Sequence, residues 1–261
     1  MNILCVGDVV GERGVRFACD RLPALRRETG ADLVVVNAEN ADKSGTGLRR
    51  EEAEALLTVA DVLTGGNHSY DRADEKLYTE QERVLHPANY PFTEDAAGCC
   101  LIDTGRLGTV RVISLCGVAF MDPLDNPFKR VDALLAAGEA KYTVVDFHAE
   151  STAEKKALAF HLDGRVSAVF GTHTHVQTAD EQVLPAGTGF ITDVGMTGPA
   201  VSVLGMAPEA AVMRQRERRR ARLEVAGGPM MLNAALFTLD DATGLCVAVK
   251  RIDFREALSP P

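Results

Sequence analysis

The stretch Phe170-Gly171-Thr172-His173-Thr174-His175 closes an apolar run that starts at Val166 and predicts a buried strand. Residues two apart in extended backbone point to the same side, so both imidazoles can face one spot. Two imidazoles can hold a metal ion, but a catalytic site usually needs further ligands. The sequence therefore predicts a fold in which other strands deliver those ligands to the same place.

Segments typical of strands and helices alternate along most of the chain. We expect strands at residues 2–6, 33–37, 61–64, 110–115, 142–147, 166–170 and 189–192. We expect helices at residues 15–28, 50–60, 126–138 and 152–162. Residues 230–239 and 245–254 flank an Asp-Ala-Thr-Gly turn and are typical of a hairpin. This order predicts an α/β sandwich with a largely parallel portion and antiparallel additions near the carboxyl end.

The length of 261 residues suits one large domain, and we expect a single domain over residues 1–261. The segment of residues 70–106 is polar, rich in acidic residues and without a clear strand rhythm. We interpret it as a small insertion, such as a lid.

Charge and hydropathy argue against two classes of partner. The net charge of −9 disfavours binding to long nucleic acid. No apolar run reaches the roughly 20 residues of a membrane span, and the run at residues 1–6 has no basic region and is shorter than we expect of a signal peptide. We therefore expect a cytoplasmic protein. Its six cysteines contain no C-x-x-C pair, and we expect them to be reduced and mostly buried.

Side chains that can bind metal follow five of the predicted strands. In open α/β sheets, ligands bind beyond the carboxyl ends of the strands. The residues at these ends are Asp8, Glu39, Asn40, Asn67, His68, His148, His173 and His175. Singly, each has an ordinary explanation: Asp8 could cap a helix, and His148 could be a buried histidine with satisfied hydrogen bonds. Their common location favours a metal site instead.

The number of ligands suits two ions. Glu39, at a central strand end, is the natural bridging carboxylate. Asp8, Asn40 and His175 could complete one shell, and Asn67, His148 and His173 the other. Oxygen and nitrogen donors without thiolate suit Mn, Fe or Zn. Two such ions about 3.5–4 Å apart can activate water and stabilise in-line displacement at phosphorus. Because two carboxylates do not neutralise two divalent ions, the site favours an anionic substrate.

The order of these motifs resembles the calcineurin-like metallophosphoesterases. It comprises Gly7-Asp8, Glu39, Gly66-Asn67-His68, His148 and Gly171-Thr172-His173-Thr174-His175. Two further stretches, Val36-Asn37-Ala38-Glu39-Asn40 and Thr192-Asp193-Val194-Gly195-Met196-Thr197-Gly198, resemble the YmdB-like group more narrowly. The resemblance implies a four-layer αββα sandwich of two mixed β-sheets flanked by helices, with a dinuclear metal site. It also implies hydrolysis of phosphodiesters, with 2′,3′-cyclic nucleotides as the substrate class.

The chain departs from common patterns of that superfamily at two motifs. Many relatives have Asp-x-His at the first motif, where this chain has Val10 after Asp8 and Val9. Since valine cannot bind metal, the YmdB-like pattern suggests Asn40 as the replacement donor. Many relatives also have an acid after the Gly-Asn-His histidine, where Ser69 stands here. Asp71 could orient His68 instead.

We interpret His68 separately from the ligands, because beside Asn67 it can reach the phosphate. We expect it to protonate the leaving ribose oxygen or to stabilise charge on the phosphoryl oxygens. A loop histidine without chemistry is the alternative. Gly195 and Thr197 lie in a segment that could offer backbone N–H groups to phosphate, although an ordinary turn would look the same.

Other polar residues favour structural roles. Six arginines between Arg214 and Arg222 indicate a solvated helix or a subunit contact rather than a phosphate clamp. His86 and His161 are interpreted as structural.

The sequence thus predicts a phosphodiesterase with two divalent metal ions, Fe or Mn first and Zn next. A metal-bound hydroxide would attack phosphorus in line, and the substrate would be a small phosphodiester such as a 2′,3′-cyclic nucleotide. Two alternatives stay open: a phosphomonoesterase, and a non-enzymatic regulator that binds a nucleotide or partner. Turnover separates the regulator from the enzymes. A homo-oligomer is compatible with all three.

Overall fold

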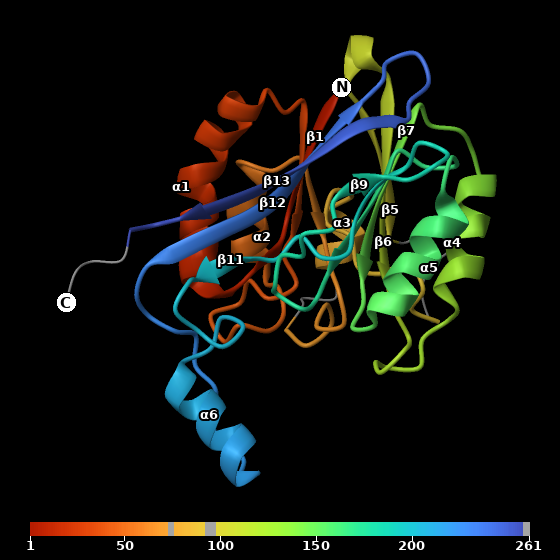
Figure 1. Cartoon of the computed structure of the whole chain (residues 1–261). Coiled ribbons are helices and arrows are strands. Elements are labelled where there is room, and N and C mark those ends of the chain that lie inside the picture. Colours follow the sequence, from red (N-terminus) through yellow and green to blue (C-terminus); the bar gives the residue numbers. More distant parts are fainter. Residues whose placement is uncertain (73–75, 92–97, 258–261) are drawn as a thin grey trace.

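Two β-sheets lie face to face in the computed structural model, and helices cover the outer face of each sheet (Figure 1). The structure describes residues 1–72, 76–91 and 98–257. Alternation of side chains along each strand divides the core into layers. Ile3 and Cys5 of the first strand point between the sheets, whereas Leu4 and Val6 point to the helices. Full burial of one such aliphatic side chain contributes about 1.5–3 kcal/mol. The predicted four-layer αββα sandwich is confirmed.

The first sheet is mixed, with parallel pairing among the strands that lead to the polar loops. Its strands, in spatial order, are β2 (Asp8–Val9), β11 (Met196–Pro199), β12 (Met230–Leu239), β1 (Asn2–Val6), β3 (Leu33–Asn37) and β4 (Val62–Thr64). β13 (Cys246–Arg255) pairs antiparallel with β12, and β12 pairs antiparallel with β1. The predicted antiparallel hairpin near the carboxyl end is therefore confirmed.

The second sheet has a parallel centre and antiparallel edges. Its strands, in spatial order, are β5 (Cys99–Asp103), β6 (Thr109–Cys116), β7 (Tyr142–His148), β8 (Ala168–Thr172), β10 (Gly189–Ile191) and β9 (Gln182–Val183). β6, β7, β8 and β10 run parallel to one another, whereas β5 and β9 pair antiparallel at the two edges. β5 lies in the segment that shows no clear strand rhythm in the sequence. The rhythm is absent because β5 is an edge strand and only one of its five residues is buried.

The described residues contain six α-helices. They are α1 (Gly11–Thr29), α2 (Arg50–Leu57), α3 (Leu77–Glu80), α4 (Pro127–Ala136), α5 (Thr152–Leu162) and α6 (Pro208–Glu217), with a 3₁₀ turn at Gly105–Leu107. α1 begins earlier than predicted, because Gly14 lets the helix approach β11: a Cβ there would lie 2.7 Å from the Thr197 carbonyl oxygen. It ends at Gly30, whose φ of 63° suits glycine.

The predicted insertion at residues 70–106 overlaps two stretches, 73–75 and 92–97, that lie outside the described residues. Its described part contains α3 and β5. A lid role stays a prediction. Within the described ranges, no helix combines the length and the apolar content needed to cross a lipid bilayer.

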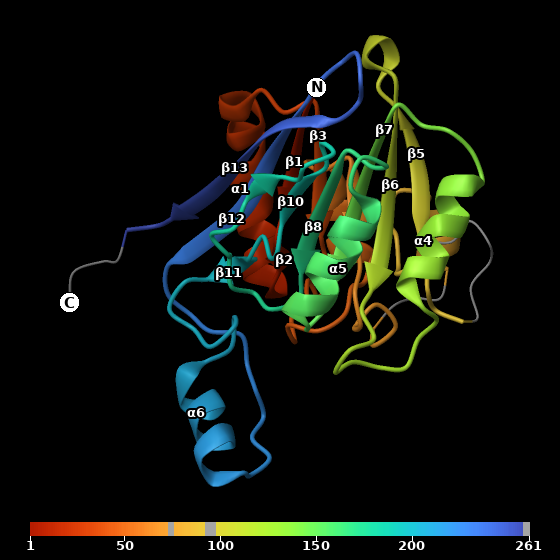
Figure 2. The ribbon, with the colours of Figure 1, turned by 45° about the vertical axis from the view of Figure 1, so that its right-hand side comes forward.

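The arginine-rich segment lies apart from the two sheets. α6 extends away from the rest of the chain in both views (Figures 1 and 2), and Ala211 is its one buried residue. The six arginines from Arg214 to Arg222 are exposed, as expected for a solvated helix and the loop after it. Whether this segment also contacts another subunit stays a prediction.

Candidate metal centre

The loops that follow five strands meet at one edge of the double sheet. Parallel pairing of β1, β3 and β4, and of β7 and β8, brings their carboxyl ends side by side. The polar residues at these ends are Asp8 after β1, Glu39 and Asn40 after β3, Asn67 and His68 after β4, His148 at the end of β7, and His173 and His175 after β8. The contacts among these residues form one continuous network.

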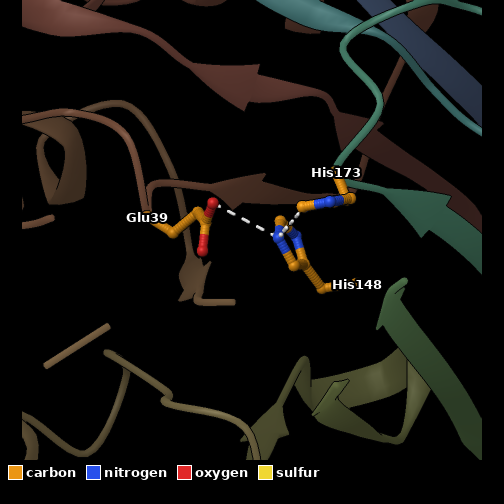
Figure 3. Close-up of side chains that lie close together, drawn as sticks. All are labelled: Glu39, His148 and His173. Carbon is orange, nitrogen blue, oxygen red and sulfur yellow. Dashed lines mark hydrogen bonds and ion pairs between the residues drawn. The ribbon is translucent and has the colours of Figure 1, made fainter. Parts of the chain in front are cut away.

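Glu39, His148 and His173 form the centre of this network (Figure 3). Glu39 Oε1 lies 3.2 Å from His148 Nε2, and His173 Nδ1 lies 3.0 Å from the same nitrogen. One ligand atom of each side chain lies within 4.8 Å of the other two. Asn67 Oδ1 approaches His148 Nε2 to 3.0 Å. Four potential ligands therefore surround a spot that a cation could occupy.

The orientation of His148 is set by Thr172 and Asp146. The Thr172 hydroxyl donates to Asp146 Oδ1 at 2.7 Å and lies 3.0 Å from His148 Nδ1. Having donated its proton to Asp146, the hydroxyl can only accept from His148. A neutral His148 therefore carries its proton on Nδ1 and directs an unprotonated Nε2 toward Glu39. Hydrogen bonds of this kind orient metal-binding histidines.

The other two histidines are held in the same way. His173 Nε2 lies 3.1 Å from Glu150 Oε2, and His175 Nδ1 lies 3.1 Å from the Leu204 carbonyl oxygen. Both oxygens are acceptors, so each ring donates outward. His173 Nδ1 and His175 Nε2 are thereby left as lone-pair donors facing the cluster. When all three rings are neutral, each imidazole can thus present an unprotonated nitrogen to the same region.

Asp8 supplies a buried oxygen that has no hydrogen-bond partner among the described residues. Its Oδ2 accepts the His173 N–H at 3.2 Å, but its buried Oδ1 makes no hydrogen bond. That Oδ1 lies 3.7 Å from both His175 Nε2 and His148 Nδ1. Burial raises the pKa of Asp8, and the two histidines oppose that rise. A buried oxygen without a partner costs about 1–3 kcal/mol or more, which a bound cation would offset.

Asn40 lies between Glu39 and His175. Its Nδ2 is 2.9 Å from Glu39 Oε1 and 3.1 Å from His175 Nε2. The amide therefore offers its donor group to two acceptors. Rotation of the amide by 180° would direct Oδ1 to the same place, and Asn40 could then serve as a ligand.

Glycine is required beside the cluster. A Cβ at Gly66 would lie 2.2 Å from Glu39 Oε2 and 2.5 Å from His148 Nε2. The first residue of the Gly-Asn-His motif therefore keeps the space between the two ligand loops open.

His68 lies at the rim of the cluster, with about a third of its side chain exposed. Its backbone N–H donates to Glu39 Oε2 at 2.9 Å, and its Nδ1 lies 2.8 Å from Asp71 Oδ2. Asp71 therefore makes the contact that the sequence suggested. With Nδ1 engaged, Nε2 is the nitrogen left to face a substrate. The catalytic role of His68 stays a prediction.

The two predicted substrate-binding residues are engaged within the fold. The Gly195 N–H donates to Asp193 Oδ1 at 2.8 Å, and Thr197 is fully buried in β11 rather than in a turn. The Gly195 carbonyl oxygen accepts the Asp8 backbone N–H at 3.1 Å, so Gly195 contacts the cluster through its backbone. The binding role of both residues stays a prediction. His86 packs among Tyr70, Tyr78 and Tyr90, and His161 pairs with Asp132, both away from the cluster. All six cysteines are free, and four are buried.

The charges of the cluster also suit a cation. Burial alone would raise the pKa of Glu39, but His148 lowers it to about 2. Burial would lower the pKa of His148, but Glu39 raises it to about 9. Burial and the neighbouring His148 lower the pKa of His173 to about 3. A proton on His148 thus balances the carboxylates where a divalent ion would otherwise do so. The donor set, the tautomers and the unsatisfied Asp8 oxygen all fit metal binding.

Sequence reasoning did not identify the groups that orient the histidines. Thr172 lies inside the Gly-Thr-His-Thr-His motif, so its position was a usable signal. Asp146 lies two residues before His148 on the same strand face, which is another signal. Glu150 and the Leu204 carbonyl give no such signal, because their roles depend on loop conformation.

Two mixed sheets with helices on both faces, and a ligand cluster at their strand ends, define a protein of the metallophosphoesterase type. The chain belongs to the family described as YmdB-like protein, whose sequence profile matches residues 4–252.

Three relatives cover nearly the whole chain. A 2′,3′-cyclic-nucleotide 2′-phosphodiesterase of Bacillus subtilis (strain 168) is 40% identical over 256 residues, covering 97% of this chain and 96% of its own. A solved structure of a hypothetical protein from Thermus thermophilus is 38% identical, with a TM-score of 0.90 and coverage of 98% and 100%. A solved structure described as a novel phosphatase of Mycoplasma pneumoniae is 32% identical, with a TM-score of 0.90 and coverage of 98% and 93%.

Proposed function

We propose that this protein is a metal-dependent phosphodiesterase that hydrolyses 2′,3′-cyclic nucleotides. The observation that carries the proposal is the convergence of His148, His173 and His175, whose outward contacts leave one nitrogen of each ring facing the cluster. A buried Asp8 oxygen that makes no hydrogen bond lies beside them. The activity named for the Bacillus subtilis relative supplies the substrate class, since the two chains align over nearly their full lengths.

Two divalent ions fit the residues better than one. Asn67, His148 and His173 would hold one ion; Asp8, Asn40 and His175 would hold the other. Glu39 would bridge them, because its Oε1 lies near both His148 Nε2 and Asn40. The donors favour Mn, Fe or Zn. When bound, the ions would supply Lewis acidity and an activated water.

The chain's own groups would then bind and protonate the substrate. His68 Nε2 would donate a proton to the leaving ribose oxygen, while the Asp71 carboxylate holds the ring through Nδ1. Gly195 and Thr197 remain candidates for phosphate contact. The buried cluster lies at a loop edge, which suits a small diester rather than a long nucleic acid. We also propose that the protein is cytoplasmic.

A side-by-side assay tests the substrate class. Protein loaded with Mn²⁺ is given a 2′,3′-cyclic nucleotide, a 3′,5′-cyclic nucleotide and a phosphomonoester, with Glu39→Gln as the matched inactive control. We expect turnover to be highest on the 2′,3′-cyclic nucleotide and to be lost in the control. Fastest hydrolysis of the monoester would favour the phosphomonoesterase, in line with the phosphatase described from Mycoplasma pneumoniae. Binding without turnover of any ester would indicate a regulator.

A further inference from the structure

A buried ion pair lies behind the Gly-Thr-His-Thr-His loop and is not accounted for by the metal ligands. Lys155 Nζ of α5 lies 2.8 Å from Asp193 Oδ2, and the two side chains are 1% and 0% exposed. Removing two charges from water costs several kcal/mol per ion unless geometry and further hydrogen bonds compensate. The other bonds of Asp193 therefore indicate what the pair holds in place.

The Asp193 carboxylate is bonded to the middle of the ligand loop. Oδ2 accepts from the Thr174 backbone N–H at 3.1 Å and from the Thr174 hydroxyl at 2.8 Å. Oδ1 accepts from the Gly195 N–H at 2.8 Å. Thr174 is the residue between His173 and His175, so one carboxylate fixes the chain between two metal ligands.

This loop has a backbone that needs such an anchor. His173 has a φ of 98° and His175 a φ of 61°, both in the left-handed region that non-glycine residues avoid. Such conformations persist where surrounding contacts over-determine them. Thr174 lies between these two residues and is held by its backbone and its side chain together.

Lys155 also contacts the start of the loop. A Cβ at Gly171 would lie 1.8 Å from the Thr192 carbonyl oxygen and 3.0 Å from Lys155 Cδ. The glycine of the motif is therefore required, because the backbone just after β10 and the lysine stem pack against it. Lys155 thus supports the loop at Gly171 and, through Asp193, at Thr174.

We propose that the Lys155–Asp193 pair is a positioning element that fixes Thr174 and so presets His173 and His175 to bind metal. Lysine also neutralises a buried carboxylate that would otherwise be unpaired beneath the cluster. The inference rests on the metal centre proposed above. It gives Asp193, within the Thr192–Gly198 stretch, a structural role that is separate from substrate contact.

The test measures Mn²⁺ affinity by equilibrium dialysis and elemental analysis, separately from activity. Lys155→Met is compared with Leu158→Ala, a control that truncates a fully buried side chain of the same helix without touching Asp193. We expect Lys155→Met to weaken Mn²⁺ binding roughly 10–100-fold, as for other groups that orient metal ligands. At saturating Mn²⁺, its kcat should return close to that of the wild type. Leu158→Ala should lower the unfolding temperature and leave Mn²⁺ affinity unchanged.

A second pair keeps the test decisive if Lys155→Met fails to fold. Thr174→Val removes the hydroxyl that donates to Asp193, and Thr174→Ser retains it. We expect weaker Mn²⁺ binding in the valine variant and rescue in the serine variant. Wild-type affinity in Lys155→Met or Thr174→Val would overturn the inference, as would an equal loss in Leu158→Ala. Wild-type protein that binds no Mn²⁺ would instead contradict the proposed function itself.

Discussion

His148 Nε2 and His173 Nδ1 lie 3.0 Å apart, while the other nitrogens of the two rings face the Thr172 hydroxyl and the Glu150 carboxylate. Two lone pairs at that separation repel each other unless a proton or a cation lies between or beside them. Glu39 adds a third acceptor atom to the same spot. The strand-end cluster is therefore arranged to bind positive charge.

Metal binding is expected to stabilise the folded protein. A ligand that binds only the folded state contributes about 2.7 kcal/mol at one hundred times its Kd, which corresponds to a rise in Tm of roughly 5–10 °C for a chain of this size. Thermal unfolding in Mn²⁺ and in excess chelator measures the difference. Glu39→Gln should reduce it. Identical unfolding temperatures in the two conditions would show that the wild-type cluster does not hold the ion.

Thr172→Val is expected to weaken metal binding without removing a ligand. The hydroxyl that accepts from His148 Nδ1 is lost, so the ring can rotate or change tautomer. Loss of such a partner typically lowers metal affinity about 10–100-fold. Titration with Mn²⁺ gives the affinity. Thr143→Val is the matched control, because Thr143 is buried near the opposite end of β7. Equal affinity in the two variants would mean that Thr172 does not orient His148.

Continuous apolar runs made the central strands predictable. Such runs are typical of strands covered on both faces, and β3 and β7 are fully buried. Edge strand β5 lacks that pattern and was missed. Gly14 also concealed the start of α1, because glycine usually weakens helices. Gly14 allows the helix to pack closely against Thr197, and only the tertiary structure reveals this contact.

The metal-ligand residues were also predictable, because each follows a predicted strand closely in the sequence. The groups that hold them were harder to find. Lys155 and Asp193 are 38 residues apart and meet only because α5 packs beside the end of β10. The Leu204 carbonyl acts on His175 through the backbone and carries no side-chain signal. Sequence patterns therefore indicate the ligand atoms better than the contacts that orient them.

His68→Gln is expected to lower kcat while the metal content stays unchanged. Loss of a general acid typically costs about 10²–10⁴-fold in rate. His68 touches Glu39 only through its backbone N–H, which the substitution retains. Turnover and bound metal are measured on the same preparation. His161→Gln serves as the control, since that ring pairs with Asp132 on the outer helices. Full turnover in metal-loaded His68→Gln protein would remove the catalytic assignment.

Asp180 is expected to give the fold an acid-sensitive contribution to stability. Burial would raise its pKa, but hydrogen bonds from Thr192 and Thr178 outweigh that effect and hold the pKa below its ordinary value. The unfolded chain then takes up this proton at a higher pH than the folded protein does. The stabilisation is therefore complete above the ordinary aspartate pKa of about 4 and declines as the pH falls through the lowered folded pKa.

Urea unfolding of wild type and Asp180→Asn at pH 7 and pH 3 measures this contribution. The free energy of unfolding should be higher for the wild type than for Asp180→Asn at pH 7. The difference between the two proteins should be smaller at pH 3. Thr178→Val removes one of the donors and should give a smaller version of the same pattern. A difference that stays constant with pH would show that the carboxylate contributes through its shape alone. The charge-assisted hydrogen bonds to Thr178 and Thr192 would then have no net effect on folding.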